Sequence, residues 1–188
     1  MLLEVPYNRE NAVIYAKKWA LSRNPLFLDF TGQGGNCTNF VSQCILAGCG
    51  VTNDTPTFGW YYRSPEDRAP AWTGVEELFD FLTEQGDFPV ENGGAGPYGT
   101  VATEPSQVAL GDVIQLANAE GDFYHSLLIS GFTEGDILVC AQSNDALDRP
   151  LSSYEYASLR ILHLLGARLF FPYENRFEQL LSGTALPT

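Results

Sequence analysis

The feature that most restricts the fold of this chain is a change in hydrophobic period near residue 110. Before it, apolar residues recur at the three- and four-residue spacing of a helix. After it, they form short runs bounded by turn residues, as strands do. Helices that precede strands in this order favour an α+β fold, with N-terminal helices packed on a C-terminal antiparallel sheet.

The first half of the chain is expected to contain three helices, over residues 9–21, 37–47 and 73–84. Asn8 can cap the first helix and Gly48 can end the second. The run TGVE reads as a capping box that opens the third. The apolar stripes of these helices are expected to face a common core.

The second half begins with residues 87–109, which are rich in glycine and proline and are expected to form a surface loop. Strands are expected over 112–116, 125–132 and 137–142, with one or two more over 158–171 and a short helix over 177–181. The run TEGD is expected to join the second and third strands as a hairpin.

The length of 188 residues suits a single domain, with a core from about residue 7 to 172. The formal net charge is −13, which would repel nucleic acids and anionic lipid surfaces. We expect no nucleic acid partner and no membrane insertion. No leader pattern is present, so the chain is expected to be cytoplasmic as given, or secreted or wall-bound if a leader has been removed.

Four cysteines are present, and no two of them have the spacing of a zinc knuckle. With only two histidines available, we expect no metal and no other cofactor. A disulfide between Cys44 and Cys49 is conceivable, but reduced thiols in the core are favoured. The apolar neighbours of Cys44, Cys49 and Cys140 indicate structural roles for these three residues.

The fourth, Cys37, lies in the run GGNCTNFVSQC at 34–44. Glycines let the backbone turn sharply, and a helix is expected to begin at the cysteine. A helix N-terminus carries partial positive charge and unpaired N–H groups, which favour a thiolate and can hold an oxyanion. We predict that Cys37 is a nucleophile; the alternative is that it is a small buried residue.

A nucleophilic cysteine needs a base, and His125 is favoured over His163. His125 begins an apolar strand, where a strand end commonly opens onto a cleft. His163 lies within an apolar run, which indicates a histidine on a sheet face or in the core.

The imidazole is in turn expected to need an orienting acceptor. If Glu134 and Gly135 form a two-residue turn, the hairpin register places His125 opposite Asn144. Asn144 is therefore the first choice, and Gln142, on the same strand face, is the second. A one-residue bulge would shift this register.

Several short runs resemble the bacterial putative amidase domain family. The most specific is CTNFVSQ at 37–43. The others, in matching order, are YNRENAVIYA (7–16), NP (24–25), WYY (60–62), AWT (71–73), GDVI (111–114), YHSLLISG (124–131), QSND (142–145) and PL (150–151). The resemblance spans about residues 7–155. It implies a papain-like cysteine hydrolase fold, related to the NlpC/P60 and CHAP wall-cutting domains.

The resemblance also implies a Cys–His pair, and Cys37 and His125 fall on the matching positions. The implied activity is hydrolysis of an amide bond in a peptide or in peptidoglycan, through a thioester. Two residues depart from the pattern: Asn36 replaces the usual Asp, and Gln142 replaces a frequent His. These departures make a binding module without catalysis the main alternative. A transferase that uses the same thiol and a purely structural or partner-binding protein are two further alternatives.

The remaining predictions concern the oxyanion and the cleft. Gln33 is a candidate donor to the oxyanion beside the N–H of Cys37. Asn36, next to the nucleophile, is a second candidate for contact with the oxyanion or substrate. Aromatic residues make up 13% of the chain, which fits either core packing or a lined groove. The aromatic candidates for the cleft are Trp60, Tyr61, Tyr62, Trp72 and Tyr124.

Overall fold

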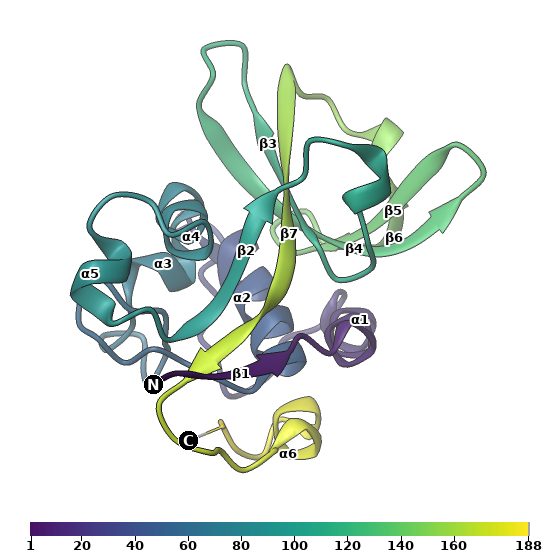
Figure 1. Cartoon of the computed structure of the whole chain (residues 1–188). Helices are drawn as coiled ribbons and strands as arrows, with labels where there is room; N and C mark the ends of the chain where they lie inside the picture. Colours follow the sequence, from purple (N-terminus) through teal and green to yellow (C-terminus); the bar gives the residue numbers. More distant parts are fainter. Residues whose placement is uncertain (188) are drawn as a thin grey trace.

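The computed structural model describes residues 1–187 and has an α+β architecture, in which helices pack against a curled antiparallel sheet (Figure 1). The helices are α1 (Arg9–Trp19), α2 (Asn36–Cys49), α3 (Pro70–Thr73), α4 (Val75–Leu82), α5 (Phe88–Asn92) and α6 (Phe177–Ser182). The strands are β1 (Leu3–Pro6), β2 (Gly96–Val101), β3 (Val113–Ala117), β4 (Phe123–Thr133), β5 (Asp136–Ala141), β6 (Ala146–Pro150) and β7 (Ser158–Leu169). Two short 3-10 turns, η1 (Pro105–Gln107) and η2 (Leu151–Ser153), complete the described elements.

The sheet has the strand order β1-β7-β3-β4-β5-β6, and β2 pairs separately with β7. Strand β7 has 12 residues and is long enough to pair with several strands along its length. Its first part pairs with β3 and its last part pairs with β1. All strand pairs of this sheet within residues 1–187 are antiparallel. Figure 1 shows α2 crossing behind β7, between α1 on one side and α3 with α4 on the other.

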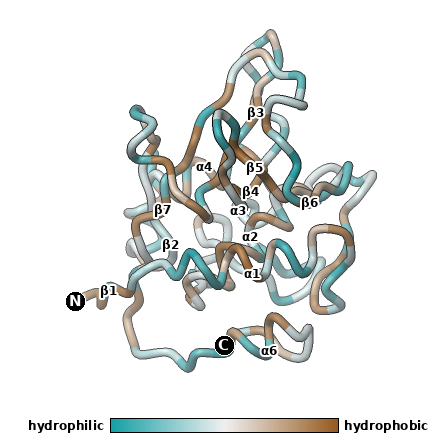
Figure 2. The backbone as a smooth tube through the Cα atoms, turned by 90° about the vertical axis from the view of Figure 1, so that its right-hand side faces the viewer, coloured by the Kyte–Doolittle hydropathy of each residue, from teal (hydrophilic) through white to brown (hydrophobic). Residues whose placement is uncertain are grey.

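The central strands are buried on both faces. Val113, Leu128 and Cys140 belong to the larger core, which they share with α1 and α2. Their neighbours along the strands, such as Ile114 and Leu127, form a second apolar cluster on the opposite face. Successive strand residues point to opposite faces, which explains this division. Figure 2 shows the hydrophobic stretches mainly at the centre of the molecule, where the helices meet the sheet.

The first two predicted helices are confirmed, with shifted ends. The side chain of Asn8 caps α1 by accepting a hydrogen bond of 3.0 Å from the Asn11 N–H. Helix α2 continues past Gly48 and ends at Gly50, which has the left-handed φ of 69° that favours glycine. Gly48 lies inside the helix. The ring of Tyr7 occupies the space that a Cβ at residue 48 would need, so this packing requires glycine there.

The predicted capping box at 73–76 is wrong. Thr73 ends the short helix α3, and Gly74 precedes α4 without a side-chain cap. The hydroxyl of Thr73 instead accepts a hydrogen bond of 3.3 Å from Nε of Arg68. A contact with the preceding loop thus uses the hydroxyl that the capping-box pattern had assigned to the helix.

The predicted strands at 112–116, 125–132 and 137–142 correspond to β3, β4 and β5, the region 158–171 supplies one strand, and the short helix at 177–181 corresponds to α6. Strands β1, β2 and β6 were not predicted from the sequence. Residues 87–109 were expected to be a loop, but they contain α5 and β2, which pairs with β7. Within residues 1–187, no helix combines the length and apolarity that a membrane crossing requires.

Candidate active site

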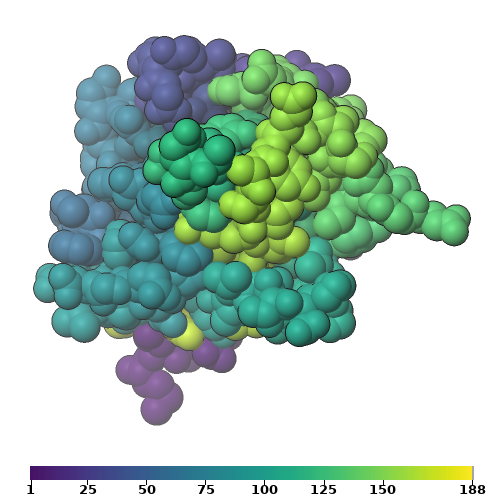
Figure 3. Space-filling model, turned by 90° about the horizontal axis from the view of Figure 1, so that it is seen from above, coloured from purple at the N-terminus to yellow at the C-terminus, as the bar shows by residue number. Residues whose placement is uncertain are grey.

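A pocket of about 570 Å³ lies where the start of α2 meets the sheet. Three separate segments line it: the loop before α2, the start of β4, and the chain around β6 and η2. Figure 3 shows the blue segment around residues 25–40 lying beside the green segment around residues 145–155 on this face. The lining residues are Gly34, Gly35, Cys37, Tyr124, His125, Ser143, Asn144, Arg149, Ser153, Tyr154 and Glu155.

Cys37 lies in the first turn of α2, as the sequence predicted, although the helix begins one residue earlier at Asn36. Gly35 precedes the helix with a φ of 140°, and a Cβ at this position would lie 3.1 Å from the carbonyl oxygen of Thr73. Glycine is therefore required both by the conformation and by the close approach of α3. The first-turn N–H groups have no partner within the helix and are available to an anion.

The residues that follow Cys37 and His125 are hydrogen-bonded to each other. Oγ1 of Thr38 lies 3.0 Å from Oγ of Ser126, and both residues are buried. This contact joins the first turn of α2 to β4 and brings Cys37 and His125 to the same pocket. Thr38 and Ser126 were missed by the sequence analysis, although both lie inside runs that it had singled out.

Burial is the main cause that lowers the pKa of His125 from 6.5 to about 4, and the positive charge of Arg149 lowers it further. The imidazole is therefore neutral at physiological pH and able to accept a proton. Two aromatic rings lie near the imidazole, with centroid distances of 6.3 Å to Tyr124 and 6.2 Å to Tyr154.

The predicted orienting residues do not hydrogen-bond to the imidazole, since His125 forms no side-chain hydrogen bond within residues 1–187. The turn at 134–135 forms as expected, with Thr133 opposite Asp136. A bulge between Ile129 and Gly131 then shifts the register by one residue. In addition, β5 ends at Ala141, so Asn144 lies in the β5–β6 turn with a φ of 67°, where it lines the pocket without facing His125 as a strand partner.

The two departures from the family pattern lie in direct contact. Nδ2 of Asn36 donates a hydrogen bond of 3.0 Å to Oε1 of Gln142, and both side chains are buried. Oδ1 of Asn36 accepts from the N–H of Phe30. Nε2 of Gln142 donates to the carbonyls of Trp19 and Ser22. Asn36 and Gln142 therefore hold the loops around the nucleophile together, and neither lines the pocket.

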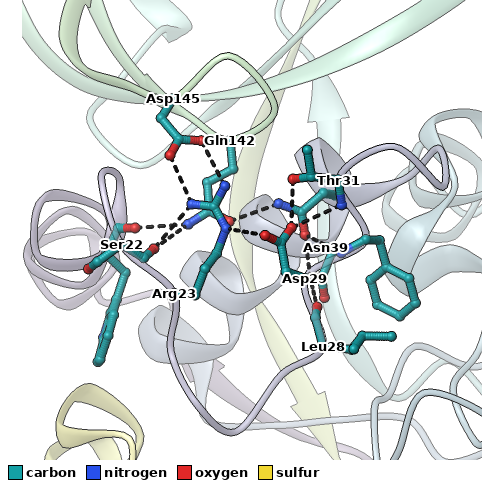
Figure 4. A network of polar contacts seen from close by, with 11 residues as sticks. Ser22, Arg23, Leu28, Asp29, Thr31, Asn39, Gln142 and Asp145 are labelled. Atoms are coloured by element: carbon teal, nitrogen blue, oxygen red, sulfur yellow. Dashed lines mark hydrogen bonds and ion pairs between the residues drawn. The ribbon is translucent and has the colours of Figure 1, made fainter.

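An ion-pair network reinforces the same junction (Figure 4). Arg23 donates to both carboxylate oxygens of Asp145 at 3.0 Å and to Asp29 at 2.9 Å. Asp145 belongs to the β5–β6 turn that carries Asn144, and Asp29 belongs to the loop that leads to α2. Arg23 thus ties two of the three segments that meet near the pocket.

The other polar residues of the run at 37–43 anchor α2 in the core. Asn39 accepts from the indole of Trp72 at 2.9 Å, and Ser42 accepts from the indole of Trp60 at 3.1 Å. Both tryptophans are fully buried. The structure therefore does not bring Trp60 or Trp72 into the pocket, and Tyr61 and Tyr62 also lie outside it.

Of the remaining candidates, Tyr124 lines the pocket and Gln33 does not. Tyr124 is half-exposed and donates a hydrogen bond of 3.1 Å to the carbonyl of Glu155. Gln33 is exposed in the loop before α2 and lies outside the lining. Arg149 also lines the pocket, but it was not predicted as a site residue. It lies in β6, a strand that the sequence did not indicate.

His163 and the other thiols have structural surroundings. Nδ1 of His163 lies 2.8 Å from Oδ2 of Asp112, which is fully buried and also pairs with Arg9. Cys44, Cys49 and Cys140 are free and buried, and burial raises the pKa of each thiol. Among residues 1–187, no group of three or more metal-binding side chains occurs.

The contact between Asn36 and Gln142 yields a prediction about stability. In Asn36→Asp, a carboxylate oxygen would oppose Oε1 of Gln142, so we expect the free energy of unfolding to fall by about 2 kcal/mol at neutral pH. The loss should shrink at acidic pH, because a protonated carboxyl can donate to Oε1. Denaturant titrations of the variant at several pH values measure this change.

The second half of the test adds Gln142→His to the Asn36→Asp variant. A protonated imidazole can donate to the new carboxylate, so the double variant should recover about 1 kcal/mol relative to the sum of the single changes. Strictly additive effects of the two substitutions would contradict the coupling that the hydrogen bond predicts.

Comparison with known proteins places this chain in a family. A family model described as "Putative amidase domain" matches residues 6–165. A Bacillus subtilis (strain 168) protein named "Uncharacterized protein YhbB" is 31% identical over 145 residues, which cover 74% of this chain and 42% of that protein. The chain therefore spans less than half the length of this relative. No solved structure matches the chain.

Proposed function

Because this chain belongs to the family described as "Putative amidase domain", we propose that it hydrolyses amide bonds through a thioester on Cys37. The observation that carries this proposal is the meeting of Cys37 and His125 in one pocket. The thiol lies at the start of a helix, and the imidazole lies on the adjoining strand.

In the proposed reaction, neutral His125 accepts the proton of the Cys37 thiol as sulfur attacks the carbonyl carbon of the amide. The tetrahedral intermediate collapses when its C–N bond breaks, and the leaving nitrogen takes the proton from His125. Water then attacks the thioester with His125 again as the base. The products are a carboxylic acid and an amine, and the thiol is regenerated.

The oxyanion is assigned to the first turn of α2. The N–H groups there have no intrahelical partner and carry the positive end of the helix dipole. This supports the role expected for the N–H of Cys37. The exposed position of Gln33 gives no support to its proposed role as a second donor.

The same arrangement supports a papain-like relationship. A cysteine at the start of a buried helix, packed against an antiparallel sheet that carries the histidine, is the arrangement implied by the sequence resemblance. The aromatic rings near the imidazole are those of Tyr124 and Tyr154. We infer a papain-like cysteine hydrolase in which no third residue among residues 1–187 is hydrogen-bonded to the imidazole.

A binding module without catalytic activity is the second candidate. It is favoured by one observation, namely the absence of a hydrogen bond that orients the imidazole within residues 1–187. For both candidates we propose a peptide or a peptidoglycan fragment as the ligand, an idea that rests on the family resemblance.

The proposed function predicts a covalent intermediate. Incubation with peptide amides or peptidoglycan fragments, followed by acid quenching and mass spectrometry, should reveal the acyl group on the peptide that contains Cys37. Hydroxylamine should remove it, because thioesters are cleaved by this nucleophile. Bound fragments with neither acylation nor amine release would identify a binding module, and transfer of the acyl group to an added amine would identify a transferase.

A further inference from the structure

The pocket beside Cys37 contains a positive charge that the rest of the chain leaves unpaired. Within residues 1–187, seven of the ten Lys and Arg side chains form ion pairs with carboxylates, and Arg149 forms none. This is notable in a chain with 23 acidic residues. Arg149 lines the same pocket as Cys37 and His125.

The guanidinium of Arg149 is held in place by neutral groups. Nε donates 2.8 Å to Oγ of Ser153, and Nη2 donates 3.0 Å to the carbonyl of the same residue. The group also stacks over the ring of Tyr154 at 3.9 Å from its centroid. These contacts use two of the five N–H donors of an arginine. The side chain is therefore fixed, and the remaining donors are available to a ligand.

We infer that Arg149 binds a carboxylate of the substrate, so that the preferred substrate is an amide with a carboxylate near the bond that is cleaved. An acidic peptide has this chemistry. The planar fork of donors matches a carboxylate in both geometry and charge, and its fixed position lowers the entropy cost of binding. This inference rests on the proposed reaction at Cys37, and it adds the substrate class.

One other charged residue lines the pocket beside Arg149 and His125. Glu155 is exposed, and its carboxylate forms no ion pair with Arg149 in the structure. A substrate carboxylate would have to approach against its negative charge. Glu155→Gln should therefore strengthen the preference for an anionic ligand.

Two reagents of nearly equal size test the inference without requiring hydrolysis. Iodoacetate and iodoacetamide both alkylate a thiol with loss of iodide, but only iodoacetate carries a carboxylate. Peptide mapping by mass spectrometry gives the rate at Cys37 separately from the three other cysteines. The ratio of the two rates cancels any change in the ionisation of Cys37, because ionisation affects both reactions equally.

Arg149→Gln should lower the ratio of the iodoacetate rate to the iodoacetamide rate by about tenfold, the size expected for a lost charge-assisted hydrogen bond. Arg176→Gln is the matched control. It removes the same charge from a residue that pairs with Glu174 and lies outside the pocket, so the ratio should stay near that of the unchanged protein. Arg149→Lys should give an intermediate ratio, because lysine keeps the charge and loses the fork.

Equal ratios in Arg149→Gln and Arg176→Gln would overturn the inference. A drop in both rates by the same factor would also overturn it, since Arg149 would then act only on the thiol or on folding. If the ratio falls as expected but the unchanged protein hydrolyses no amide, the carboxylate site stands and the proposed function fails. Where hydrolysis is found, peptides that differ only by Glu in place of Gln beside the cleaved bond should show the same preference.

Discussion

Replacing Cys37 with serine should lower the rate of amide hydrolysis by at least about a thousandfold. The substitution changes one atom at the start of α2 and retains a side chain of similar shape. A serine hydroxyl is a far weaker nucleophile toward a carbonyl when only a neutral imidazole assists it. The folded structure should be retained, because within residues 1–187 the thiol takes part in one hydrogen-bond contact, 3.8 Å from Sγ to Oγ1 of Thr38, which a serine hydroxyl can also make.

The measurement is the initial rate of amine release, together with a thermal unfolding curve for each variant. Cys49→Ala serves as the matched control, since it alters a buried thiol at the opposite end of the same helix. The control should lose some stability and keep its activity. If Cys37→Ser retains most of the rate, the thioester mechanism is wrong.

The second large effect is expected for His125→Gln, which should also lower hydrolysis by about a thousandfold, because glutamine cannot accept the thiol proton. In the unchanged protein, the acidic limb of kcat/KM should have its midpoint near pH 4, where the base becomes protonated. A histidine in water would place this midpoint near 6.5. Arg149→Gln should raise the midpoint, because the guanidinium is one cause of the low pKa.

The lowered pKa of His125 also predicts a dependence of stability on pH. Between pH 6.5 and 4 the unfolded chain binds a proton that the folded protein excludes, so the free energy of unfolding falls as the pH is lowered through this range. The difference between the two pKa values corresponds to about 3 kcal/mol. Denaturant titrations at several pH values should show that His125→Gln removes this part of the acid destabilisation.

His163→Gln is the matched control for His125→Gln in the measurements of hydrolysis rate and of kcat/KM against pH. The amide can preserve a hydrogen bond to Asp112, and the residue lies outside the pocket. Its rate of hydrolysis should stay close to that of the unchanged protein. If His163→Gln lost as much activity as His125→Gln, the assignment of His125 as the base would be contradicted.

The sequence alone determined the features that depend on neighbours along the chain. The helical spacing of apolar residues and the cap at Asn8 predicted α1, and the glycines before Cys37 predicted where α2 begins. Alternation and turn residues predicted β3, β4 and β5. These features are local, because hydrogen bonds and side-chain periodicity within one segment favour them in any surroundings.

The tertiary structure alone decided which side chains share the pocket. A bulge after Ile129 shifted the register, and β5 ended at Ala141, so Asn144 lies in a turn and not opposite His125; neither feature has a clear signal in the sequence. Asn36 and Gln142 lie 106 residues apart in the sequence, so nothing local predicts their contact. Arg149 reached the pocket because β6, which was missed, pairs with β5 and carries it there. Long-range packing sets these positions, since buried polar groups must find partners wherever the fold brings them together.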